Sequence, residues 1–259
     1  MIPKIIHYCW FGGAPKPESV IKCINSWKEH CADFQIIEWN EKNFDIGSCP
    51  RYVIDAYENK KWAFATDYIR LRIIYENGGV YFDTDVELLK GIHDLLQYNA
   101  FFGFEDGKHV NTGLGFGAEP GISVIKEMMD EYNSLEFILP DGSLNQETCP
   151  AINTRTLLKY GLVQNDKRQI LDDGIMILPS IYMCPIDYET GKMKRSRNTI
   201  SIHWFDATWM SKDNREYHEK HRKRLKTEKA DYWKYLPNRI LMKLLGNERY
   251  EKLKNQVKQ

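Results

Sequence analysis

The N-terminal part of this 259-residue chain alternates between two apolar patterns. Residues 4–11 (KIIHYCWF) are rich in β-branched and aromatic side chains and stop at a pair of glycines, which predicts a buried strand that runs into a loop. After Pro17, apolar residues recur at helical spacing, and residues 34–39 (FQIIEW) predict a second strand. A strand, a helix and a strand in so short a stretch predict a parallel sheet in an α/β fold.

The same alternation continues along the chain. Residues 61–77 carry apolar side chains at helical spacing and end in Asn-Gly-Gly, which is a signal for a helix end. A short strand over residues 80–82 follows directly. We also expect strands near residues 100–104, 114–118, 175–178 and 199–204, and helices near residues 122–132 and 152–160. The predicted fold class is therefore α/β, with a mixed, mostly parallel sheet.

Charge divides the chain into two parts. Lys plus Arg and Asp plus Glu both number 36, so the overall charge gives no reason to expect a nucleic-acid partner. Residues 212–259 hold 15 basic and 7 acidic side chains, which leaves residues 1–211 with a net charge of 0 − 8 = −8. This split predicts one domain over residues 1–211 and a basic helical extension over residues 212–259.

The sequence predicts a cytosolic protein. The N-terminal apolar run is too short and too polar for the core of a signal peptide. No stretch reaches the roughly 18 apolar residues that a membrane-spanning helix needs. Six cysteines are scattered without a Cys-x-x-Cys pair, so we expect reduced, mostly buried thiols.

Two carboxylates follow the strand at residues 80–82, in the tripeptide Asp83-Thr84-Asp85. In an extended segment residues i and i+2 point the same way, so these carboxylates are expected to converge. Mn²⁺ and Mg²⁺ prefer such oxygen ligands together with substrate phosphates. In open α/β sheets, ligands bind beyond the carboxyl ends of the strands. The tripeptide therefore predicts a metal and diphosphate site; the alternative is a pair that caps the next element.

The helix before this strand carries Asp67 and Arg70, which lie three residues apart and share a face. A buried Asp–Arg pair can offer hydrogen-bond acceptors and donors to sugar hydroxyls. The alternative is a structural salt bridge.

Residues 63–70 (AFATDYIR) and 78–85 (GGVYFDTD) resemble the signature of glycosyltransferase family 32. This family includes capsular-polysaccharide transferases and yeast-type initiating mannosyltransferases, and it is similar here to the glucosylating domains of large bacterial toxins. Residues 2–13 (IPKIIHYCWFGG) fit its N-terminal strand. The resemblance covers residues 2–118 strongly and 145–210 loosely. It implies a GT-A-like, single Rossmann-type catalytic domain.

The resemblance also implies roles for single residues. Trp10 would stack on the nucleotide base; for this residue the alternative is a buried core aromatic. Asp67 and Arg70 would hold the donor sugar, and Asp83 and Asp85 would handle the ribose and the metal. Thr66 and Asn111 lie in matching segments and are implied to bind the donor.

The segment at residues 201–209 (SIHWFDATW) resembles the family's late His-Trp segment. There His203 would complete the metal shell, and Thr208 and Trp209 would cover the diphosphate. For His203 the alternative is a structural histidine. Thr208 stands where the family often has serine and keeps the hydroxyl. Cys149 replaces the glycine of a Thr-Gly-Pro segment, so donor-sugar specificity does not carry over.

The implied activity is hexosyl transfer, with Mn²⁺ or Mg²⁺ as cofactor, from a UDP- or GDP-sugar to a glycan or lipid-linked glycan. The resemblance further implies retention of anomeric configuration and a role in capsular polysaccharide biosynthesis. Two alternatives stay open at this point. One is a metal-dependent nucleotide-sugar hydrolase that uses Asp83, Asp85 and His203, and the other is a non-catalytic glycan- or nucleotide-binding protein.

The basic extension contains an aromatic and aliphatic cluster over residues 232–245 among Lys and Arg. This composition is typical of an amphipathic helix on an anionic membrane, here the inner membrane face. The alternative is a helix that packs on the domain or on a partner subunit.

Overall fold

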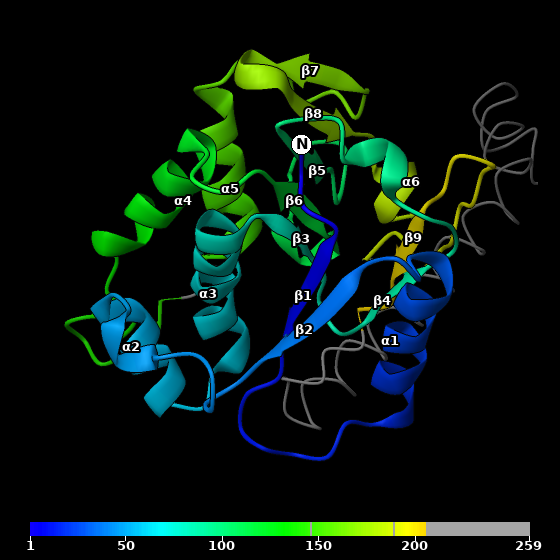
Figure 1. Ribbon diagram of the computed structural model, residues 1–259. Helices are drawn as coiled ribbons and strands as arrows, with labels where there is room; N and C mark the ends of the chain where they lie inside the picture. The colour runs from blue at the N-terminus through cyan, green and yellow to red at the C-terminus, as the bar shows by residue number, and fades with distance from the viewer. Residues whose placement is uncertain (146, 189, 206–259) are drawn as a thin grey trace, which may run out of the picture. The chain divides into compact units, whose positions relative to one another are not determined.

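The computed structural model describes residues 1–145, 147–188 and 190–205 (Figure 1). The chain divides into two compact units, residues 1–187 with 193–209 and residues 188–192 with 210–259. Every helix and strand of the described ranges belongs to the first unit. The predicted domain boundary at residue 211 and the helical extension over residues 212–259 lie outside the described residues and stay predictions.

A seven-stranded sheet forms the centre of the first unit, in the order β2-β1-β3-β6-β5-β8-β7. Strand β1 is parallel to β2 and β3, and β5 is parallel to β8, whereas β6 and β7 run antiparallel to their neighbours. Five of the seven strands therefore share one direction, and the predicted α/β class with a mixed, mostly parallel sheet is confirmed. The strands are β1 (Ile5–Cys9), β2 (Gln35–Trp39), β3 (Gly79–Tyr81), β5 (Ala100–Gly103), β6 (Phe116–Ala118), β7 (Gln169–Leu171) and β8 (Ile175–Leu178).

Helices cover both faces of this sheet. In Figure 1, α1 lies on one side, and α2, α3, α4 and α5 lie on the other. The helices are α1 (Glu18–His30), α2 (Arg51–Glu58), α3 (Trp62–Asn77), α4 (Ser123–Asn133), α5 (Cys149–Leu158) and α6 (Ser180–Met183), with short 3₁₀ turns η1 (Ile46–Ser48), η2 (His93–Leu95), η3 (Thr112–Leu114) and η4 (Asp172–Gly174).

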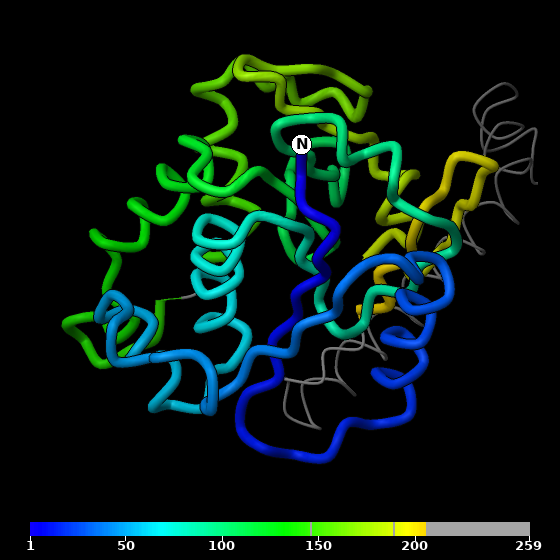
Figure 2. The backbone as a smooth tube through the Cα atoms, viewed as in Figure 1, coloured from blue at the N-terminus to red at the C-terminus, as the bar shows by residue number. Residues whose placement is uncertain are grey.

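The central strands are buried on both faces, which explains why they read as continuous apolar runs. Phe101 and Met176 face the core beneath α1, whereas Phe102 and Ile177 face the core beneath α2 to α5. The backbone trace in Figure 2 shows β1, drawn in blue, running between these two sides. Buried strands of this kind position the loops at their ends rigidly.

A second sheet pairs two short strands, β4 (Val86–Leu88) and β9 (Ser201–His203), in antiparallel register. The sequence predicts β9 within residues 199–204, but it does not predict β4, β7 or α2. For β4 and β7, three residues are too few for a strand period to be recognised in sequence. Ile21, which fits the helical spacing of α1, is 47% exposed.

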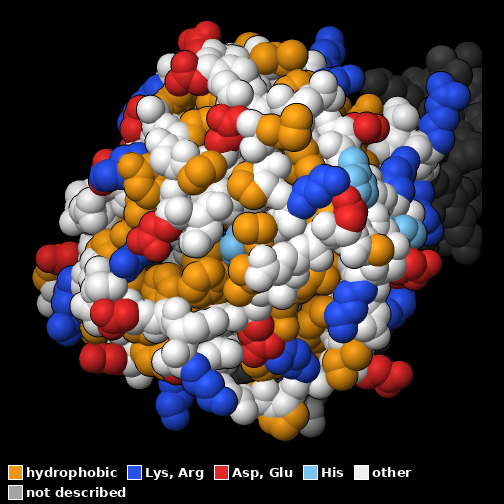
Figure 3. Space-filling view, viewed as in Figure 1, with side chains coloured by type: hydrophobic (Ala, Val, Ile, Leu, Met, Phe, Trp, Pro, Cys, Tyr) orange, Lys and Arg blue, Asp and Glu red, His pale blue; other side chains and the backbone are white. Residues whose placement is uncertain are grey.

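All six cysteines are buried and free, as predicted. None of the helices in the described ranges combines the length and the apolar character that crossing a bilayer requires. On the face shown in Figure 3, basic and acidic side chains are interspersed over the surface.

His7 links the first three strands at the centre of the fold. Trp39 donates its indole N–H to His7 Nδ1 at 3.0 Å, so the proton of the neutral ring is on Nε2, which lies 3.0 Å from the carbonyl oxygen of Gly78. Gly79 begins β3 with φ +95°, and a Cβ there would lie 2.9 Å from His7 Nε2. Burial lowers the pKa of His7 to about 4, although the Gly78 bond opposes this shift.

We expect His7 to make the fold sensitive to acid. Its pKa is lower in the folded chain than in the unfolded chain, so its contribution is complete above the unfolded value and is lost as the pH falls toward 4. The loss should be on the order of 2–3 kcal/mol. Denaturant unfolding of wild type and His7→Gln at neutral and acidic pH measures this, and the variant should show the weaker pH dependence. His30→Gln is the control, and equal pH dependence of all three proteins would contradict the assignment.

Candidate functional site

Helix α3 brings Asp67 and Arg70 into the interior of the protein. The helix carries buried apolar side chains around most of its circumference, which is typical of a helix inside a core. Arg70 is 3% exposed, and its Nη2 lies 3.0 Å from Asp67 Oδ1. The same nitrogen lies 3.2 Å from Asp83 Oδ1. Arg70 therefore bridges two carboxylates that come from different elements.

Asp83 and Asp85 lie in a tight turn between β3 and β4. The backbone N–H of Val86 donates to the carbonyl oxygen of Asp83 at 3.1 Å. The predicted extended geometry of this tripeptide is therefore wrong, because the chain reverses direction here. The turn still brings the two half-buried carboxylates close together, so that one ion could contact both.

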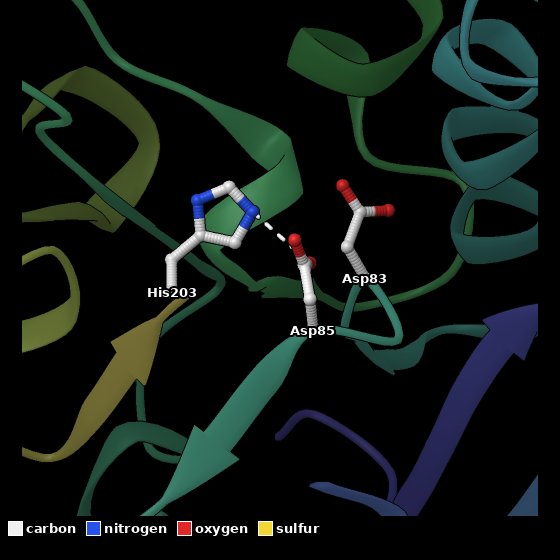
Figure 4. Close-up of side chains that lie close together, drawn as sticks. All are labelled: Asp83, Asp85 and His203. Carbon is white, nitrogen blue, oxygen red and sulfur yellow. Dashed lines mark ion pairs between the residues drawn. The ribbon is translucent and has the colours of Figure 1, made fainter. Parts of the chain in front are cut away.

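The β4–β9 sheet brings His203 to this turn. Its register places His203 opposite Val86, and the backbone N–H of Trp204 donates to the carbonyl oxygen of Asp85 at 3.0 Å. His203 Nε2 lies 3.1 Å from Asp85 Oδ1, the ion pair that is dashed in Figure 4. One ligand atom from each of Asp83, Asp85 and His203 lies within 4.8 Å of the other two.

Burial and neighbouring charges shift the pKa values of the ionisable groups at this site. Burial raises the pKa of Asp67 to about 6, and Arg70 opposes this shift. Burial also raises the pKa of Asp83, again against Arg70, while the nearby charge of Asp85 raises it further. For His203, burial acts to lower the pKa, but the carboxylates of Asp85 and Asp83 outweigh it and the pKa is raised. Clusters of this kind are common at functional sites.

The residues of this site fit a divalent cation. Two carboxylates and one imidazole are suitable ligands for Mn²⁺ or Mg²⁺, although the imidazole favours Mn²⁺. His203 Nδ1 is buried and has no hydrogen-bond partner within the described part of the chain. Asp67 and Asp83 share one guanidinium and Asp85 pairs with His203, so three carboxylates face at most two positive charges, and a cation would offset the excess negative charge.

Tyr81 belongs to the site although the sequence analysis does not single it out. Its hydroxyl donates to Asp83 Oδ1 at 3.1 Å, and its ring centroid lies 5.2 Å from Arg70 Cζ. Its place two residues before Asp83 is the only signal that sequence could have offered, since a strand presents residues i and i+2 on one face.

The site extends beyond Arg70 through three further residues, Cys149, Asn111 and Glu105. The Cys149 thiol donates to Asn111 Oδ1 at 3.4 Å, and Arg70 Nη1 lies 3.9 Å from the Cys149 sulfur. Asn111 Nδ2 donates to Glu105 Oε2 at 2.9 Å. The sequence analysis names Asn111 and Cys149 but misses Glu105, which lies in a loop without a recognisable motif.

Of the remaining predicted site residues, Trp10 and Thr66 lie within the described part of the chain. Half-buried Trp10 follows β1 and donates its indole N–H to the carbonyl oxygen of Ala14 at 2.7 Å, with Lys16 Nζ 5.6 Å from its ring. The Thr66 hydroxyl donates within α3, and its carbonyl oxygen accepts from Arg70 Nε at 3.2 Å. Thr208 and Trp209 lie outside the described residues.

Sequence comparison connects this site to known proteins. Residues 17–102 match the family described as glycosyltransferase sugar-binding region containing DXD motif. The match includes Asp67, Arg70 and both carboxylates of the turn. An uncharacterised glycosyltransferase of Acanthamoeba polyphaga mimivirus is 29% identical over 206 residues, which cover 74% of this chain and 76% of that protein.

Three solved structures are similar at low sequence identity. PaToxG glycosyltransferase is 16% identical with a TM-score of 0.45, over 61% of this chain and 69% of that chain. A glycosyltransferase involved in the glycosylation of the major capsid of PBCV-1 is 11% identical with a TM-score of 0.43, over 84% of this chain and 100% of that chain. The glycosyltransferase GlyE of Streptococcus pneumoniae TIGR4 is 12% identical with a TM-score of 0.44, over 86% of this chain and 60% of that chain.

Gly113 should be essential to the geometry of this site. A Cβ at this position would lie 2.5 Å from Asp83 Oδ2 and 3.2 Å from Arg70 Nη1. Gly113→Ala should therefore displace the Asp83–Arg70 pair and destabilise the fold by roughly 1–3 kcal/mol. Thermal unfolding measures this as a fall in Tm of roughly 2–4 °C for each kcal/mol.

Gly107→Ala is the matched control, because its Cβ would meet its nearest neighbour at an ordinary 3.7 Å. We expect this control to keep the wild-type Tm. Equal Tm values for Gly113→Ala and wild type would contradict this prediction, because the site would then accommodate the added methyl group without loss of stability.

Proposed function

We propose that this glycosyltransferase, whose residues 17–102 match the family with a DXD-containing sugar-binding region, transfers a hexosyl group from a UDP- or GDP-sugar to a glycan or lipid-linked glycan. The observation that carries the proposal is the convergence of Asp83, Asp85 and His203 beside the Asp67–Arg70 pair. A role in polysaccharide biosynthesis is the pathway that the sequence resemblance supports.

The proposed cofactor is Mn²⁺ or Mg²⁺, held by Asp83, Asp85 and His203. When bound, such an ion neutralises charge on a diphosphate leaving group. Asp85 and His203 are already paired at 3.1 Å, so a ligand pair is formed by the fold itself. Binding of the ion through His203 Nε2 would release the proton that this ring shares with Asp85, because a ligating imidazole is neutral.

Donor recognition is proposed for the residues around Arg70. The Asp67 carboxylate and Asn111 can hydrogen-bond to sugar hydroxyls, and Arg70 adds positive charge near the phosphates. Trp10 offers an indole face for the base, where Lys16 now lies. Thr66 would act through its carbonyl, which holds Arg70. Thr208 and Trp209 remain predicted contacts of the diphosphate.

The proposed reaction proceeds with retention of anomeric configuration. The acceptor oxygen forms a bond to the anomeric carbon, the bond from that carbon to the diphosphate oxygen breaks, and the acceptor proton leaves with the diphosphate. Arg70 is suited to stabilise the developing negative charge because it is held rigidly by two carboxylates. Isolation of a covalent glycosyl-enzyme would contradict this route. Membrane contact through residues 212–259 stays a prediction.

A nucleoside diphosphate should stabilise the chain only when metal is present. At a hundred times its dissociation constant, UDP or GDP should add about 2.7 kcal/mol to the free energy of unfolding. That corresponds to a rise in Tm of roughly 2–4 °C for each kcal/mol. The measurement is a thermal shift with UDP, GDP or CMP, each with Mn²⁺ and with a chelator.

Asp85→Asn should abolish the shift, whereas the control Asp94→Asn, an exposed carboxylate, should keep it. If no nucleotide shifts the wild-type Tm, the proposed donor class is wrong. If a nucleotide-sugar binds but free sugar is released at the same rate with and without acceptor, the chain is a hydrolase.

A further inference from the structure

Glu105 begins a loop on the far side of Asn111 from Arg70. It follows the residues of β5, and its backbone N–H donates to the carbonyl oxygen of His109 at 2.8 Å, so residues 105–109 form a closed loop. Its Oε2 accepts from Asn111 Nδ2 at 2.9 Å. Oε1 makes no hydrogen bond that involves the described residues, so one carboxylate oxygen is oriented and one is available for a ligand.

The contacts of Asn111 connect Glu105 to the donor side of the site. Asn111 Oδ1 accepts from the Cys149 thiol and from the backbone N–H of Gly113, which lies against Asp83. Burial raises the pKa of Glu105, and the hydrogen bond from Asn111 and the charges of His203 and His109 oppose this shift. Hydrogen bonds of Asn111 therefore connect Glu105, which begins this loop, to the residues that lie against Asp83.

A shallow surface hollow lies between the loop at residues 106–109, which directly follows Glu105 in the chain, and the loop at residues 164–166. The lining side chains are polar and mixed in charge, which suits a neutral, hydroxyl-rich ligand. The lining residues are Asp106, Gly107, Lys108, His109, Gln164, Asn165 and Asp166.

Hydrogen bonds fix the walls of this hollow. Gln164 Nε2 donates to the carbonyl oxygen of Lys108 at 2.9 Å and joins the two loops. Asp166 accepts from the backbone N–H of Ser180 at 2.6 Å and from its hydroxyl at 2.8 Å. The polar groups of the hollow are therefore held in place before a ligand arrives, which lowers the cost of binding.

We propose that this hollow, together with Glu105, is the acceptor subsite and binds a sugar ring of the acceptor glycan through its hydroxyls. The proposal rests on the proposed glycosyl transfer. Glu105 Oε1 accepts a hydrogen bond from the acceptor hydroxyl and orients its oxygen toward the donor sugar. Glu105 is thus a positioning carboxylate, and the proton still leaves with the diphosphate.

The test is saturation-transfer NMR on the full chain in two samples, one with Mg²⁺ and UDP and one with Mg²⁺ and GDP. The probes are methyl α-D-glucopyranoside, methyl α-D-mannopyranoside and methyl β-D-galactopyranoside. At least one probe should bind, and Gly107→Phe, which fills the hollow, should weaken its binding at least tenfold, or about 1.4 kcal/mol. Glu105→Gln should weaken binding of the same probe, because a neutral amide is a poorer hydrogen-bond acceptor than the carboxylate that it replaces.

Nucleotide binding separates this proposal from the proposed function. Gly107→Phe should keep the wild-type thermal shift with nucleotide, and Ser134→Phe, a change at an exposed site, should keep probe binding. The acceptor subsite is overturned if no probe binds to a wild-type chain that does bind nucleotide. It is also overturned if Gly107→Phe and Glu105→Gln both bind the probe as wild type does. A chain that binds probes in the hollow but no nucleotide would contradict the donor assignment alone.

Discussion

Arg70 is a fully charged group in the interior of this protein, and the site is built around it. A buried guanidinium is tolerated only when carboxylates and hydrogen-bond acceptors surround it. Arg70 obtains these from Asp67 on its own helix, from Asp83 in the turn after β3 and from the carbonyl oxygen of Thr66. The pairing connects α3 to the end of β3, so the position of the turn depends on one buried ion pair.

The same pairing leaves the turn with unbalanced charge. Arg70 is shared between two carboxylates, and Asp85 has His203 as its ion-pair partner. His203 reaches Asp85 because β4 starts directly after the turn and pairs with β9. A glycosyltransferase needs positive charge where the diphosphate leaves, and a cation at this position would provide it. Fold, charge and the proposed chemistry are therefore consistent at this turn.

Local patterns predict the parts of the site that are local in sequence. The three-residue spacing of Asp67 and Arg70 and the Asp83-x-Asp85 tripeptide are visible in the chain because neighbours on one element determine them. His203 could be placed only through the family resemblance, because the pairing of β4 with β9 joins residues more than a hundred positions apart. The central strands are predicted for a similar reason, since burial on both faces leaves a continuous apolar run.

Other features could not be predicted from local patterns. The turn at Asp83 differs from the expected extended segment because β4, with three residues, follows it at once. Glu105 has no motif, and its role depends on a contact with Asn111 across a loop. Cys149 reads as a departure from a Thr-Gly-Pro segment, but its thiol contacts both Arg70 and Asn111. Such contacts depend on tertiary packing.

The most direct test of the account is the uptake of Mn²⁺ by the full chain, followed from the electron paramagnetic resonance signal of the free ion. The account predicts that UDP or GDP increases Mn²⁺ affinity, and that Asp83→Asn and His203→Ala each weaken it by roughly tenfold or more. Wild-type uptake in both variants, or no uptake by the wild-type chain with either nucleotide, would contradict a metal and diphosphate site at this turn.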